Sequence, residues 1–216
     1  MVDLKKYIDP DSLRGKGLWP SGFDPGQVPI AGKSRDVILS AMECEGFAIG
    51  GVSADNAFVV LSRDSTIYLF ARPEYSNYRR VASLRFGHIP RKHDVDHVHS
   101  RNLATHYGYR YVLVPLLPQR PNRQHGSLFE KQLKEIETGD DVPEVCFPDD
   151  RIVDKILQRN SEVRRRLISD QYAYDPKKRT ELGLTLKQRG LWNMALGFDR
   201  RAPEKFVASL RPLINL

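Results

Sequence analysis

The chain has 216 residues, 40% hydrophobic and 28% charged, and this balance excludes a disordered protein and indicates a folded globular one. No apolar run approaches the roughly 20 residues that a membrane-spanning helix needs, so a membrane protein is not expected. The net charge of +7 favours acidic partners such as nucleic acid over basic ones.

The compartment is indicated by the N-terminal sequence and by the cysteines. The first residues contain no apolar stretch of the kind found in secretory signals. Cys44 and Cys146 have neither metal-ligand spacing nor the pattern of a disulfide framework. We therefore expect a cytoplasmic protein, although secretion without a signal peptide is compatible with the same features.

Three regions follow one another along the chain. Residues 1–33 are rich in proline and glycine and are predicted to form an extended arm. Residues 34–140 are predicted to form an α+β core domain with a small antiparallel sheet. Residues 141–216 are predicted to be mainly helical and to pack on the core, with helices over 152–168, 184–196 and 203–210.

The core domain begins with a predicted helix that Ser34 caps and Gly46 ends. Three β-like runs follow at 47–52, 57–62 and 66–71, separated by short polar turns, and they predict an antiparallel meander. Residues 77–84 are predicted to form a short helix or strand.

Histidines and positive charge are concentrated in the next part of the chain. All six histidines lie between His88 and His125, and the segment 77–134 holds eleven Arg or Lys against three acids, a net charge of +8. Within it, the alternation over 95–99 predicts a half-buried strand with His97 on one face. A second strand is predicted over 111–115, and an amphipathic helix from residue 127.

A strand–strand–helix unit of this kind can present the groups that phosphodiester hydrolysis requires. His97 on the strand can act as a general base near neutral pH. Asn122 with Glu130 or His125, at the helix entry and first turns, can supply ligands to Mg²⁺ or another divalent cation. The guanidinium groups that lie close in sequence can bind the phosphate; these belong to Arg101, Arg120 and Arg123. A zinc site made by the neighbouring histidines is a further possibility, although no cysteine completes it.

The stretch 93–137 resembles the His-Me finger (ββα-metal) nucleases, a superfamily that includes HNH enzymes and the non-specific DNA/RNA endonucleases. In one alignment, the sequence DVDH at 94–97 resembles the D-R-G-H signature of the non-specific endonucleases. Asn122 and Glu130 then stand eight residues apart, as the asparagine and glutamate of that family do. This alignment implies a ββα-metal core with His97 as general base and Asn122 and Glu130 at the metal.

A second alignment uses the HNH motif itself. Asp96 and His97 then resemble its D-H pair, and His125 lies near the position of the final histidine ligand. This alignment keeps His97 as the base but implies Asp96 and His125 as metal ligands. The resemblance departs from the family pattern at Val95 and Asp96, which replace Arg-Gly, and no CxxC pair supports a structural zinc.

Three functions follow from these patterns. The first is a metal-dependent endonuclease that acts on nucleic acid, with DNA favoured over RNA, in a toxin, defence or repair setting. The second is a non-catalytic nucleic-acid-binding protein on a degenerate ββα scaffold. The third is an interaction module or toxin whose basic face is covered by an acidic inhibitor protein.

Overall fold

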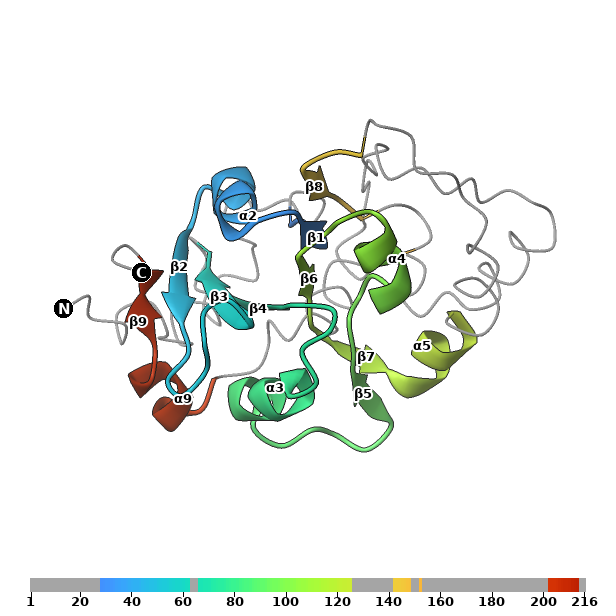
Figure 1. The fold of residues 1–216 in the computed structure, drawn as a ribbon. Helices are drawn as coiled ribbons and strands as arrows, with labels where there is room; N and C mark the ends of the chain where they lie inside the picture. The colour runs from blue at the N-terminus through green and yellow to red at the C-terminus, as the bar shows by residue number, and fades with distance from the viewer. Residues whose placement is uncertain (1–27, 63–65, 126–141, 149–151, 153–201, 214–216) are drawn as a thin grey trace, which may run out of the picture.

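The computed structural model of the chain describes residues 28–62, 66–125, 142–148, 152 and 202–213, without the side chains of Pro121, Gln124 and His125. These residues form a mixed α/β fold with a mostly antiparallel sheet and few helices (Figure 1). The larger sheet has seven strands in the order β8-β1-β6-β4-β3-β2-β9, and a separate sheet joins β5 to β7. All the pairings in both sheets are antiparallel.

The strands of the larger sheet come from distant parts of the chain. They are β1 (Ala31–Gly32), β2 (Glu45–Ala48), β3 (Ala57–Leu61), β4 (Ile67–Ala71), β6 (Tyr111–Leu113), β8 (Val145–Cys146) and β9 (Arg211–Pro212). The smaller sheet consists of β5 (His93–Val95) and β7 (Leu116–Pro118). The helices are α2 (Arg35–Met42), α3 (Tyr78–Phe86), α4 (Arg101–His106), α5 (Gln119–His125) and α9 (Glu204–Ala208).

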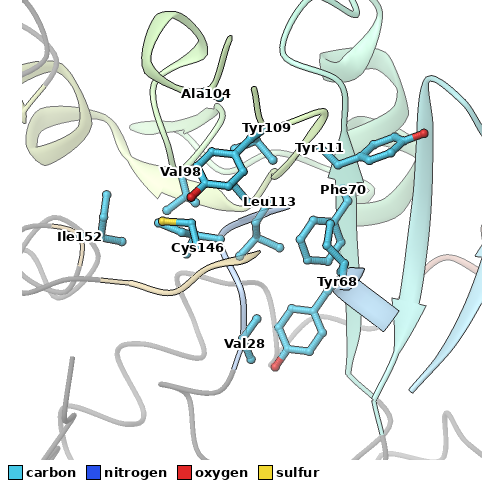
Figure 2. Packing of buried hydrophobic residues seen from close by; sticks show 14 of the residues in the cluster. Val28, Tyr68, Phe70, Val98, Ala104, Tyr109, Tyr111, Leu113, Cys146 and Ile152 are labelled. Atoms are coloured by element: carbon cyan, nitrogen blue, oxygen red, sulfur yellow. The ribbon is translucent and has the colours of Figure 1, made fainter. Parts of the chain in front are cut away.

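The central strands of the larger sheet are buried on both faces. Along β3, Phe58 and Val60 belong to one hydrophobic cluster and Val59 and Leu61 to another, as the alternation of side chains in a strand requires. Helices α2 and α4 pack in the first cluster, and α3 and α9 pack in the second. In the first cluster, Tyr109 lies beside Cys146 (Figure 2). Burial on both sides explains why β3 and β4 are continuous apolar runs.

The predicted first helix and the predicted meander are confirmed. The helix does not run to Gly46, however: it ends at Met42 with Glu43 as its C-cap, and Gly46 lies in β2. Helix α2 is capped by Ser34, whose hydroxyl oxygen accepts a hydrogen bond of 3.3 Å from the main-chain N–H of Val37. Strands β2, β3 and β4 pair in sequence order. Strand β2 begins two residues earlier than predicted, at Glu45, and is shorter. Residues 77–84, predicted as helix or strand, lie largely in α3.

The outer regions of the chain also contribute strands to the larger sheet. Strand β1 lies within residues 28–33, which were predicted to be part of the extended arm. Val28 and Ile30 are buried in the core. The arm therefore ends earlier than predicted. The region 141–216, predicted to be helical, supplies β8 and β9 in addition to α9. The predicted helix over 184–196 and most of that over 152–168 lie outside the described residues.

Candidate active site

The candidate site lies where the chain leaves the larger sheet. After β6 the chain passes Pro115 and forms β7, which pairs with β5, so that His93 faces Pro118 and Val95 faces Leu116. Helix α5 follows β7 directly and contacts both strands of the pair (Figure 1). The two strands and the helix therefore form one hairpin-like unit, although the strands are far apart in sequence.

This unit uses other residues than the sequence predicted. The predicted strand over 95–99 is wrong, because β5 ends at Val95 and His97 lies in the segment after it. The predicted second strand, 111–115, instead contains β6 of the larger sheet. Helix α5 begins at Gln119, and the helix predicted from residue 127 lies outside the described residues. Pro121 is tolerated there because N–H groups in the first turn have no partner within the helix.

Asp96 is the residue that joins the parts of the site. Its Oδ1 accepts a hydrogen bond of 2.9 Å from the main-chain N–H of His97 and a longer one of 3.4 Å from the Tyr78 hydroxyl. Its Oδ2 accepts a hydrogen bond of 3.2 Å from the Asn122 amide. Asn122 lies in α5 and is only 7% exposed. The carboxylate thus connects the segment after β5 with α3 and α5.

His97 is buried beside this carboxylate. Its side chain is 2% exposed, and neither ring nitrogen makes a hydrogen bond of good geometry with a described residue, although the Arg72 main chain lies close enough to raise the pKa of the ring. Its ring centroid lies 4.3 Å from that of Tyr78, with 49° between the planes. Burial lowers the pKa of His97 to about 4, and Asp96 opposes this shift. The imidazole is therefore neutral at neutral pH, which is the form that accepts a proton.

Arginines from two helices lie close enough to act on the same imidazole. Arg101 begins α4 and Arg79 lies in the first turn of α3; both are exposed, and their charges lower the pKa of His97. Arg79 also lies over the Tyr78 ring, with 5.3 Å between its Cζ atom and the ring centroid. Two positive charges near a neutral base suit the binding of a phosphate group.

The other two arginines predicted from the sequence lie on α5. Arg123 is exposed, and its Nε lies 3.4 Å from Oδ2 of Asp94. Asp94 also accepts a hydrogen bond of 3.2 Å from Gln119. Asp94 therefore holds the start of α5 against β5 rather than facing Asn122. Arg120 is exposed on the same helix. Because Arg123 lies beside the Asp94 carboxylate, it attracts an external phosphate less strongly than an unpaired arginine would.

Asp96 and Asn122 could supply two oxygen ligands to a hydrated divalent cation. Asn122 presents its Nδ2 to Asp96, and a half-turn of the amide presents Oδ1 in its place. Magnesium prefers oxygen ligands and retains several waters, so two protein oxygens can hold it. Each of the two predicted ligand sets contributes one member: Asn122 comes from the first alignment and Asp96 from the second.

The remaining predicted ligands are not part of the described site. Glu130 and the His125 side chain lie outside the described residues. In the part of the chain that is described, no three His, Cys, Asp or Glu side chains are grouped so that they could hold a metal ion. This gives no support to a zinc site made by the neighbouring histidines. His99 is buried near Tyr109, with 6.0 Å between the ring centroids, and Tyr109 belongs to the cluster opposite the one that contains Tyr78.

Two residues of the site were missed from the sequence. Tyr78 and Arg79 precede the stretch that resembles the nucleases, and no motif marks them. The only sequence signal was indirect, because the excess of positive charge begins at this point of the chain. Tyr78 is 3% exposed and contacts both Asp96 and His97.

No protein-family model, curated protein or solved structure matches the chain. None of the described helices has the length and apolar character that crossing a bilayer requires. The geometry of the site is therefore the only basis for a proposed function.

Proposed function

We propose that this protein is a divalent-metal-dependent endonuclease that hydrolyses phosphodiester bonds of DNA, with His97 as general base. The observation that carries the proposal is the contact between Asp96 and Asn122 directly beside the buried imidazole of His97. The unit formed by β5, β7 and α5 supports a ββα-metal core, because it brings a histidine after the first strand close to an amide on the helix.

The residues of the site divide the work of hydrolysis between them. His97 accepts a proton from water as the water oxygen bonds to phosphorus, and the ester bond to the leaving oxygen breaks. The leaving oxygen then takes up a proton from solvent. A divalent cation held by Asp96 and Asn122 would neutralise charge on the phosphate and on the leaving oxygen. Arg101 and Arg79 hold the phosphate beside the base.

Nicking of supercoiled plasmid DNA in the presence of Mg²⁺ tests this function. We expect EDTA to abolish nicking by the wild-type protein, and His97→Ala to reduce it at least a hundredfold, since general bases contribute about 10²–10⁴ in rate. His106→Ala is the matched control, because His106 is an exposed histidine of the same region. Nicking by His97→Ala at the wild-type rate, in a folded protein, would refute the role of His97.

The metal ligands are tested separately by isothermal titration with Mg²⁺ in the absence of DNA. We expect Asn122→Ala and Asp96→Ala each to weaken Mg²⁺ binding by about tenfold or more, since each removes one of two protein oxygens. Glu45→Ala is the matched control, because Glu45 is an exposed acid on β2 of the larger sheet, outside the unit formed by β5, β7 and α5. Equal Mg²⁺ affinity in all three variants and the wild type would remove the metal from the proposal.

The burial of His97 favours a second function, that of a non-catalytic nucleic-acid-binding protein. Both ring nitrogens are inaccessible to water. A non-catalytic site tolerates this burial, whereas a general base must reach a water molecule before it can take a proton. This alternative predicts binding that weakens steeply with salt but is unaffected by EDTA, with no strand scission. Salt-sensitive binding without nicking, by wild-type protein and His97→Ala alike, would favour it over the endonuclease.

A further inference from the structure

We propose that Tyr78 is a positioning residue of the site: its hydroxyl orients the Asp96 carboxylate, and its ring covers and fixes the His97 imidazole. This inference rests on the proposed function, because it assigns Tyr78 a task for the base and the metal ligand named there. It also extends the site to α3, which lies outside the stretch that resembles the nucleases.

The first observation is the pair of contacts that Tyr78 makes. Its ring lies 4.3 Å from the His97 ring, and its hydroxyl donates to Oδ1 of Asp96 over 3.4 Å. The same oxygen accepts the main-chain N–H of His97 over 2.9 Å. One aromatic side chain therefore contacts both the proposed base and the proposed metal ligand, and it does so from a separate element of the fold.

The second observation is that α3 is held firmly in place. Arg85, on the same helix, is 2% exposed, and its Nε and Nη2 each donate 3.2 Å hydrogen bonds to the carbonyl oxygen of Ile67 in β4. Val81 and Phe86 pack with the second hydrophobic cluster. A helix fixed to the central sheet in this way delivers Tyr78 to the site in a defined orientation.

The third observation separates this task from ordinary core packing. A core aromatic needs only its ring, and phenylalanine would serve as well. The Tyr78 hydroxyl is instead directed at a half-buried carboxylate whose other oxygen is held by Asn122. The ring and the hydroxyl thus have separable effects, and substitutions can test them one at a time.

The test compares Tyr78→Phe, which removes only the hydroxyl, with Tyr78→Ala, which also removes the ring. Tyr75→Phe is the matched control, because Tyr75 lies just before α3 and packs against the same cluster without contacting Asp96 in any described interaction. Circular dichroism establishes that each variant is folded. If Tyr78→Ala does not fold, Tyr78→Leu takes its place, since leucine fills more of the space.

Two measurements report on the metal-free protein and do not depend on cleavage. In the first, diethyl pyrocarbonate modifies histidines at pH 7 and mass spectrometry follows His97, with exposed His106 as internal reference. We expect modification of His97 to be slow in the wild type and in Tyr78→Phe, and at least tenfold faster in Tyr78→Ala. In the second, the ¹³Cγ resonance of Asp96 is expected to shift in Tyr78→Phe and to stay unchanged in Tyr75→Phe.

The third measurement is kinetic. For DNA nicking we expect Tyr78→Phe to lower kcat about three- to tenfold with KM within twofold of the wild type, because the hydroxyl orients the site rather than binding DNA. An unchanged His97 modification rate in Tyr78→Ala, or an unchanged Asp96 resonance together with an unchanged kcat in Tyr78→Phe, overturns the proposal. If the wild type does not nick DNA but both metal-free measurements behave as expected, the endonuclease fails and the contacts of Tyr78 stand.

Discussion

The burial of His97 predicts a specific loss of stability in acid. Its pKa is lowered from 6.5 to about 4 in the folded protein, and burial is the main cause. Between these two values the unfolded chain binds a proton that the folded protein does not. The free energy of unfolding therefore rises with pH across this window and is lost as the pH falls from about 6.5 towards 4.

The size of this effect follows from the two pKa values. Their difference corresponds to about 3 kcal/mol at most, and about 2 kcal/mol of it is lost between pH 7 and pH 5. Urea unfolding at a series of pH values measures it directly. Because other groups also titrate in acid, the informative quantity is the difference between wild-type protein and His97→Gln, whose side chain has no proton to gain.

We expect His97→Gln to lose less stability than the wild type over this range, by about 2 kcal/mol. The control is His106→Gln, which removes an exposed histidine and should keep the pH dependence of the wild type. If the free energies of unfolding of wild type and His97→Gln fell in parallel with pH, the imidazole would take up its proton equally in the folded and unfolded states. That result would refute the reasoning that burial keeps it neutral.

Two further predictions concern the elements that support the site. Arg85→Met should lower the free energy of unfolding by about 1–3 kcal/mol, because it removes the donors to the Ile67 carbonyl. Arg80→Met, on the exposed side of the same helix, should change it by less than about 0.5 kcal/mol, and urea unfolding midpoints measure both variants. Ser34→Ala should destabilise by about 1 kcal/mol through loss of the α2 cap, and an unchanged thermal midpoint would show that this cap contributes nothing.

Local patterns in the sequence predicted the local elements well. The cap at Ser34 and the β-favouring runs of β3 and β4 each depend only on neighbouring residues in the sequence, so they could be recognised without knowledge of the fold. The strands around His97 could not be assigned in this way. Residues 111–113 have the same β-favouring character whether they pair with β5 or with β1 and β4, and only the packing of the whole sheet decides between these partners.

The site was predicted in part, and for a comparable reason. The sequence singled out His97, Asp96 and Asn122 individually, but the two alignments placed Asp96 and Asn122 in different ligand sets. Their contact depends on α5, a helix over Gln119–His125 that the sequence did not predict and that carries Asn122 to the Asp96 carboxylate. Tyr78 could not be found, because its role depends on the packing of α3 beside a segment almost twenty residues further along the chain.

The order of strands in the larger sheet also determines how the protein can fold during synthesis. Strands β2, β3 and β4 pair with sequence neighbours and can form as soon as residues 45–71 are available. The two outermost strands cannot, since Ala31 pairs with Cys146 and Phe47 with Pro212. The nascent meander therefore keeps the free edge of β2 unpaired until residues 211–212 have been made. Such distant pairings are slow to form, so this edge is the place where a partly made chain is most exposed to aggregation.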